Sequence, residues 1–358
     1  MFLLKSRWHF IRQNVIGYFQ QRFTSLIGLD IGTSSLKIVQ LDKLSKKNEL
    51  THFAIFPTGS GCLSQSPLAN MVQLTTALQQ GLAISCATAK NVVLALSDHY
   101  VFSREIVLPV MTSDELAEAI HWTLDEYVPY EPGSFYYDFA IMDSNVKTDR
   151  MRVFLVAVLR SLLDPLLAIL ENLHLQVLAV ETESLALLRT VSEEKDLLFL
   201  DIGAKETQLT FIQNETPVFT KSISLGGDQL IEFLAASIGC SMQEAQSFKE
   251  CQEPLLFADI TDNAARKWTT ELLRQVREAI NYYTRQYAEA AFQQLILTGR
   301  GVCWSGLREA FALEIDIPVF YHDPLANIAV APCLDQEFLA KESPALGAAI
   351  GLAMRGEM

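Results

Sequence analysis

The residue types that bind phosphate groups are concentrated in a short turn between two apolar stretches, within Leu26–Leu41. The order L-I-G-L-D-I-G-T-S-S-L-K-I-V-Q-L predicts a strand, a tight turn and a second strand. The glycine lets backbone N–H groups approach an anion, the hydroxyl groups add donors, and the carboxylate suits a hydrated Mg²⁺. The residues concerned are Asp30, Gly32, Thr33, Ser34, Ser35 and Lys37. Because ordinary turns share this pattern, this turn alone leaves a purely structural role open.

The same order of residue types returns in the other half of the chain, at Leu197–Ile212. The tip of this second hairpin consists of Asp201, Gly203, Ala204 and Lys205. Two copies of one anion-binding hairpin predict a duplicated architecture with a nucleotide clamped between the halves. In such a clamp Asp30 and Asp201 are expected to hold the metal ion through water.

A glycine pair opens a helical pattern shortly after the second hairpin. Gly226 and Gly227 directly precede Asp228 and the apolar sequence that follows it. Glycines give access to the backbone, and a helix start adds positive potential, so this turn suits a polyphosphate.

The paired D-I-G hairpins are followed by a glycine-rich turn, Gly299-Arg300-Gly301, and this order resembles the actin, Hsp70 and sugar-kinase superfamily. The resemblance implies an α/β fold, a two-lobed clamp, and ATP or ADP with Mg²⁺ as the ligand. Further motifs resemble the bacterial actin homologues PilM and FtsA. They imply nucleotide contacts for Lys249, which ends an A-x-x-x-K segment, and for Arg277, which lies on a helix expected at 271–283.

A small α+β insert is expected within residues 91–166. Helical spacing predicts a helix at Ser113–Tyr127 with Ser113 as its N-cap, and paired strands are predicted at 135–141 and 151–158. This arrangement resembles the small subdomain of FtsA and PilM, although an insert that only packs is the alternative. The expected organisation is an N-terminal extension (1–25), a first actin-like subdomain (26–90 and 167–195, completed by 341–358), the insert, and a second lobe (196–340).

One further carboxylate is a candidate for chemistry. The segment Val180–Leu187 resembles the PilM-type pattern V-D-x-E-x-x-A-L, with Glu181 in place of the usual Asp. Glu183 is the candidate catalytic residue, because a carboxylate at a strand end can orient water or metal. Capping of the following helix is the alternative role.

Composition narrows the function classes. The 358 residues are 50% hydrophobic and 20% charged, which is typical of a globular protein. A net charge of −14 argues against a nucleic-acid partner. The six cysteines include no C-x-x-C pair, so neither a disulfide framework nor a cysteine metal site is expected.

The first 25 residues differ in charge from the rest. They carry Lys5, Arg7, Arg12 and Arg22, and no acidic residue precedes Asp30. With aromatic residues at helical spacing, they predict an amphipathic helix on an anionic membrane surface. A helix packed on the body and an extension that is disordered in isolation are the alternatives.

The resemblance to the PilM family, actin-like proteins of type IV pilus assembly, covers residues 26–355. It implies a cytoplasmic scaffold at the inner-membrane face that grips the N-terminal tail of a single-span PilN-like protein, with PilO-, PilC- and PilB-type components as further partners. The implied peptide groove lies between the first large subdomain and the insert, and the insert offers as candidate contacts Val101, Ile106, Leu108, Tyr127 and Tyr130. Packing of these residues in the insert's own core is the alternative. An FtsA-like, membrane-tethered polymerising homologue and a small-molecule kinase are the alternative functions.

Departures from the family pattern fall on the base-and-ribose side. They are Gln246, Glu278, Ala279 and Arg300. Each lost contact or added side chain is expected to weaken binding by about 1–3 kcal/mol. The sequence therefore predicts weak or altered nucleotide binding and at most a weak ATPase.

Overall fold

The structure is a computed structural model that describes residues 25–44, 47–58, 70–145, 149–191, 196–251, 258–287, 291–303 and 306–357. The predicted N-terminal helix lies outside these ranges. The chain divides into two compact units, each described here by itself. The first takes the described residues of 1–46, 52–183 and 352–358, and the second takes those of 47–51 and 184–351.

The first unit is organised around a mixed sheet whose central strand carries Asp30 as its last residue but one. Its strands are β1 (Ser25–Ile31), β2 (Ser35–Leu44), the part of β3 (Lys47–Pro57) from residue 52 onward, β4 (Asn91–Leu96) and β8 (Gln176–Thr182), in the order β3-β2-β1-β4-β8. β1 runs antiparallel to β2, with Asp30 opposite Lys37, and parallel to β4. Strands β1 and β4 are apolar along nearly their whole length because both faces of the sheet are covered.

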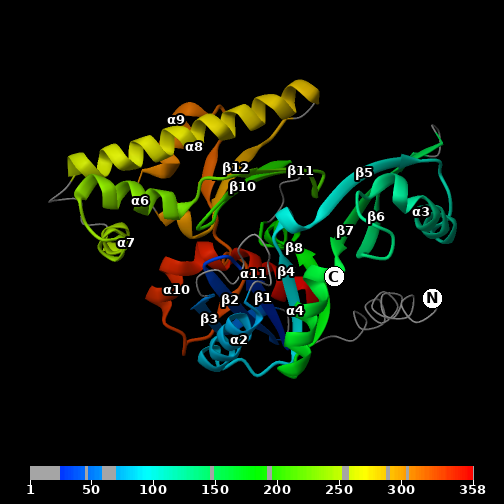
Figure 1. Cartoon of the computed structure of the whole chain (residues 1–358), viewed down its shortest axis with the longest axis horizontal. Helices are drawn as coiled ribbons and strands as arrows, with labels where there is room; N and C mark the ends of the chain where they lie inside the picture. The colour runs from blue at the N-terminus through cyan, green and yellow to red at the C-terminus, as the bar shows by residue number, and fades with distance from the viewer. Residues whose placement is uncertain are drawn as a thin grey trace. The chain divides into compact units, whose positions relative to one another are not determined.

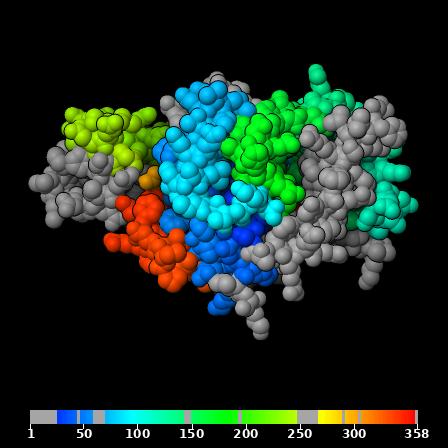
Figure 2. All heavy atoms as spheres, turned by 90° about the horizontal axis from the view of Figure 1, so that it is seen from below, coloured from blue at the N-terminus to red at the C-terminus, as the bar shows by residue number. Residues whose placement is uncertain are grey.

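Two helices lie side by side over one face of this sheet, α2 (Met71–Ser85) and α4 (Arg160–Asn172) (Figures 1 and 2). Their buried leucines share one core with β1, β2 and β4. Asn70 caps α2 by accepting a hydrogen bond from the backbone N–H of Gln73. The helices thereby fix the strand that carries Asp30.

The insert forms its own small sheet within the first unit. Its strands are β5 (Phe102–Leu108), β6 (Phe135–Asn145) and β7 (Arg150–Leu159), in the order β5-β7-β6, preceded by the 3₁₀ turn η1 (Asp98–Tyr100). The predicted pairing of residues 135–141 with 151–158 is confirmed, and the helix α3 (Ser113–Tyr127) packs on this sheet. The predicted N-cap was wrong by one residue, because Thr112 accepts the cap hydrogen bond from Glu115 N at 3.4 Å and Glu115 Oε2 accepts one from Thr112 N at 2.9 Å.

The second unit repeats the strand order of the first. β9 (Leu197–Ile202), β10 (Thr207–Gln213), β11 (Thr216–Ile223), β12 (Gln294–Thr298) and β13 (Val319–Tyr321) are ordered β11-β10-β9-β12-β13. β9 runs antiparallel to β10 and parallel to β12, as β1 does with β2 and β4. The duplicated architecture predicted from the two hairpins is therefore confirmed. β14 (Ala329–Val330) pairs with Glu49 and Leu50, which also belong to this unit.

Helices cover the second sheet, and the long helix α8 lies along it (Figure 1). They are α5 (Glu183–Leu188), α6 (Gly227–Ile238), α7 (Met242–Cys251), α8 (Ala258–Gln286), α9 (Leu307–Glu314) and α11 (Gly347–Ala353). The remaining helical segments are α10 (Gln336–Glu342) and the 3₁₀ turns η2 (Arg300–Cys303), η3 (Ser343–Leu346) and η4 (Met354–Glu357), of which η4 belongs to the first unit. α5 and α11 each cross the boundary between the units. Across the described ranges, we find no helix with the length and apolarity needed to cross a bilayer.

Candidate functional site

The first hairpin holds a buried carboxylate with one oxygen left over. Asp30 is 3% exposed at the end of β1, and its Oδ2 lies 2.9 Å from Lys37 Nζ across the hairpin. Its Oδ1 is buried and has no hydrogen-bond partner among the described residues. Leaving a charged oxygen unsatisfied is costly, so a hydrated cation or another donor at Oδ1 would be favoured.

The turn after Asp30 is held tightly. The N–H of Gly32 donates to Ser35 O at 3.0 Å, and a side chain at Gly32 would place its Cβ 2.8 Å from Lys37 Nζ. Thr58 braces the turn, since its hydroxyl donates to Gly32 O at 2.8 Å and its N–H donates to Ser34 O at 3.0 Å. Sequence reasoning missed Thr58, which lies just after β3 and carries no motif.

The tip keeps its hydroxyl groups near the surface. Ser34 is exposed, Thr33 is half-buried, and Ser35 is buried at the start of β2. The hydroxyl groups of Thr33 and Ser34 can therefore reach a ligand bound over the turn.

In the second unit, the second hairpin and the glycine pair come together. The N–H of Gly227 donates to Gly203 O at 2.9 Å, and the N–H of Asp228 donates to Ala204 O at 2.8 Å. A Cβ at Gly226 would lie 2.3 Å from Ala204 O. The tip of the hairpin thus packs directly on the start of α6, which explains why Gly226 lacks a side chain. Lys205 is exposed at this tip.

The glycine-rich turn packs on the same strand end. Gly299 has φ +84°, and a Cβ there would lie 2.2 Å from Asp201 Oδ1. A Cβ at Gly301 would lie 2.1 Å from Ile202 Cγ2. The structure therefore brings all three predicted motifs of this half together around the carboxyl end of β9.

Arg300 does not extend freely from this turn. Its Nε lies 3.2 Å from Glu342 Oε2, and Glu342 is 6% exposed. About half of the Arg300 side chain remains exposed. Sequence reasoning missed Glu342, because it lies 42 residues further along the chain.

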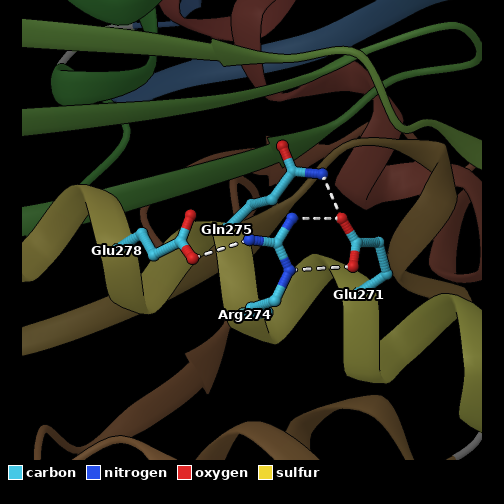
Figure 3. Close-up of polar contacts among 4 residues, drawn as sticks. All are labelled: Glu271, Arg274, Gln275 and Glu278. Carbon is cyan, nitrogen blue, oxygen red and sulfur yellow. Dashed lines mark hydrogen bonds and ion pairs between the residues drawn. The ribbon is translucent and has the colours of Figure 1, made fainter.

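Most departures on the base-and-ribose side are involved in contacts within the second unit. On α8, Arg274 binds both Glu271 and Glu278, at 2.5 and 2.6 Å (Figure 3). Hydrogen bonds from Arg274 and Gln275 lower the pKa of Glu271 to about 2. Ala279 is 7% exposed and belongs to the core of this unit.

Two further cations that the family resemblance assigns to the nucleotide, Arg277 and Lys249, lie in this unit. Arg277 forms an ion pair with Glu314 of α9. Lys249 belongs to α7, but its side chain lies outside the described residues. The nearby Gln246 is half-buried.

The strand end at β8 holds a second buried charge pair. Glu183 is half-buried in the first turn of α5, while Glu181 is buried and forms an ion pair with Arg355 of η4. Burial lowers the pKa of Arg355 to about 10. Arg355 was not among the predicted residues, since it is far from Glu181 in the sequence.

A buried histidine links several segments of the second unit. His322 Nε2 lies 2.7 Å from Thr190 Oγ1, and His322 Nδ1 lies 2.9 Å from Thr298 Oγ1. Thr190 donates to Leu187 O at 2.6 Å, so its oxygen can accept from Nε2–H, whereas the Thr298 hydroxyl has two possible acceptors, Nδ1 and, at 3.1 Å, Pro344 O. Burial lowers the pKa of His322 to about 4, so the ring is neutral near pH 7.

The candidate partner residues gather at the insert. Tyr127 and Tyr130 lie beside β5, where Arg104 is 5.9 Å from the ring of Tyr127 and Phe102 is 6.2 Å from that of Tyr130. Ile106, 4% exposed, faces the core under α3, whereas its neighbour Val107 is 52% exposed.

The other two candidates lie at the ends of β5. Leu108 is partly buried against the core under α3, and Val101 packs on the core of the larger sheet. β5 is an edge strand of its sheet, so its outer backbone edge is open among the described residues.

Comparison with known proteins gives a consistent result. The sequence model of the family described as type IV pilus assembly protein PilM matches residues 28–357. A solved structure, described as a PilM-PilN type IV pilus biogenesis complex, is 26% identical, with a TM-score of 0.80 over 94% of this chain and 99% of that chain.

Two other solved structures are similar at lower identity. The ethanolamine utilization protein EutJ from Carboxydothermus hydrogenoformans is 13% identical, with a TM-score of 0.56, over 97% of this chain and 98% of that chain. MreB5 of Spiroplasma citri, solved bound to ADP, is 11% identical, with a TM-score of 0.53, over 93% and 96%. These likenesses show a shared fold, and the predicted actin-like α/β fold is confirmed.

Proposed function

The chain belongs to the type IV pilus assembly protein PilM family, and on that premise we propose that it is a nucleotide-binding scaffold that grips the cytoplasmic peptide of a PilN-like membrane protein. The observation that carries this proposal is the match along nearly the whole chain to a structure described as a PilM-PilN complex. This match favours the pilus scaffold over the FtsA-like and kinase alternatives.

Nucleotide binding is supported by the geometry of each hairpin. The unpartnered Asp30 Oδ1 provides an acceptor for a hydrated Mg²⁺, and the hydroxyl groups of Thr33 and Ser34 lie near the surface of the same turn. The glycines at 203 and 226 let the tip of the second hairpin pack on the start of α6, where a Cβ would clash with the backbone. Among the described residues, no three side chains of the His, Cys, Asp or Glu type group together for a metal ion. A Mg²⁺ ion would therefore be held through water and the phosphates of ATP or ADP.

Asp30→Asn tests this part of the proposal. The substitution keeps the shape of the side chain and removes its charge, so titration calorimetry with Mg-ATP and Mg-ADP should show binding at least about tenfold weaker than in wild type. Glu171→Gln, an exposed carboxylate on α4, is the matched control and should bind as wild type does. Equal affinities for Asp30→Asn and wild type would overturn the assignment.

The peptide is proposed to add as a strand to the open edge of β5. Backbone hydrogen bonds would hold it, and side chains at the strand ends, Val101 and Leu108, with Tyr127 and Tyr130 alongside, would select its residues. Ile106 is buried in the core under α3 and supports β5 from that side. The acidic body favours a basic residue in the peptide and speeds its docking.

Val107→Glu tests this edge without opening the core, because Val107 is 52% exposed. Fluorescence anisotropy with the labelled N-terminal peptide of the PilN-like protein from the same organism should show clearly weakened binding. Leu313→Glu, at an exposed apolar position of α9 in the other unit, is the matched control. If Val107→Glu binds the peptide as wild type does, while Asp30→Asn does not, the peptide site lies elsewhere.

Location and further partners extend the proposal. We place the protein at the cytoplasmic face of the inner membrane, with PilO-, PilC- or PilB-type components as further partners. Family membership supports this placement.

A further inference from the structure

The outer surface of α3 exposes a tryptophan within a ring of carboxylates. Trp122 is 81% exposed, the highest value among the described aromatic residues with large exposure. The exposed acidic residues of α3 are Asp114, Glu115, Glu118, Asp125 and Glu126. α3 contains no lysine or arginine.

Helix geometry places these carboxylates around Trp122. Glu118 and Glu126 are four residues before and after it, and Asp125 is three residues after it, so all three share its face. The opposite stripe, which includes Leu116 and Ile120, is buried in the insert's core. Because that stripe packs against the small sheet that carries the β5 edge, the acidic face points away from this sheet.

Few of the described residues contact this face. Glu115 is held by Thr112 in the capping box, and the ring of His121 lies edge-on to Trp122 at 5.5 Å. No ion pair is found for Glu118, Asp125 or Glu126 among the described residues. Such an aromatic surface ringed by negative charge suits an arginine, whose guanidinium can stack on the indole while it pairs with a carboxylate.

The same chain contains a segment of matching chemistry. Residues 1–24 carry four of the 28 lysines and arginines, and none of the 42 acidic residues. They also carry aromatic residues such as Trp8, Phe10 and Tyr18. Twenty-four residues can reach up to about 80 Å when extended, which suffices to reach α3 of the same chain or of a second copy.

We propose that the outer face of α3, centred on Trp122, docks the basic aromatic segment 1–24 of this chain. Docking would cover the aromatic residues of the segment and neutralise part of the charge of α3. An anionic membrane is a poor occupant of this face because its charge has the same sign. The face of α3 and an anionic membrane would instead compete for binding of segment 1–24.

Carbodiimide crosslinking of the full-length protein tests the proposal, because this reagent joins a lysine directly to a nearby carboxylate. In wild type, mass spectrometry should find Lys5 joined to Glu118, Asp125 or Glu126. Glu118→Lys combined with Glu126→Lys should lower the yield of Lys5–Asp125 crosslinks about tenfold, because two attractive pairs become repulsive. Trp122→Ala should lower it by a smaller factor.

A matched control separates this effect from net charge. Glu171→Lys combined with Glu232→Lys changes two exposed carboxylates on α4 and α6 and should leave the α3 crosslinks unchanged. A mixture of ¹⁴N and ¹⁵N protein then shows whether the segment docks within one chain or between two copies. Both results agree with the proposal.

Two outcomes would overturn it. One is a wild-type protein in which Lys5 joins no carboxylate of α3. The other is an α3 double variant whose Lys5–Asp125 yield equals that of the control variant. If Lys5 joins nothing on α3 while the protein pellets with phosphatidylglycerol vesicles, the membrane is the occupant instead.

Discussion

Lowering the pH from 7.5 to 5 is expected to remove about 2 kcal/mol of unfolding free energy through His322 alone. Burial lowers the pKa of this histidine from its ordinary 6.5 to about 4 in the folded protein. Above pH 6.5 the side chain is neutral in both states, so its contribution is fully present. Between pH 6.5 and pH 4, His322 binds a proton in the unfolded chain but not in the folded protein. The free energy of unfolding therefore falls over this range, by about 3 kcal/mol in total.

Urea unfolding followed by circular dichroism at several pH values between 7.5 and 5 measures this effect. His322→Gln keeps a hydrogen-bonding side chain but does not titrate, so its stability should fall with pH by about 2 kcal/mol less than that of wild type. His174→Gln changes an exposed histidine and should follow wild type. If His322→Gln and wild type lose the same free energy over this range, the argument that His322 stays neutral in the fold is wrong.

Two further predictions concern packing around the nucleotide motifs, and both are measured by urea unfolding. Gly299→Ala should cost at least about 3 kcal/mol, because it combines a positive φ with a clash against Asp201, whereas Gly239→Ala has the same backbone region and open space and should cost about 1 kcal/mol. If the two variants lose equal free energies of unfolding, the structure around Gly299 adjusts to the Cβ without a measurable cost. Trp268→Phe should cost about 2 kcal/mol, because it removes the hydrogen bond from Trp268 Nε1 to Gly226 O at 3.0 Å and leaves that carbonyl buried. A cost near zero would show that the carbonyl finds another donor.

The hairpins, the duplicated strand order and the helix α3 follow from the sequence alone. Each rests on a local pattern, either apolar residues that run up to a carboxylate and a glycine or apolar residues at helical spacing. The second copy at Asp201 carried most of the information, because one D-x-G turn is common and two in order are not. The N-cap was displaced by one residue, since Thr112 and Ser113 both have suitable hydroxyl groups and only the geometry distinguishes them.

Tertiary structure alone decided which charges pair and which stay open. Arg300 pairs with Glu342, Glu181 pairs with Arg355, and Thr58 braces the turn after Asp30. These partners are far apart in the chain and are brought together by the folding of the sheets. No spacing in the sequence therefore predicts these pairs.

The clearest case is the carboxylate of Asp30. The sequence identified Asp30 as a candidate ligand by its type and its place before a glycine. Its chemistry depends on a lysine opposite it, on strands that exclude water, and on one oxygen left without a donor. A residue's type follows from the sequence, whereas its burial and its partners depend on every segment that packs around it.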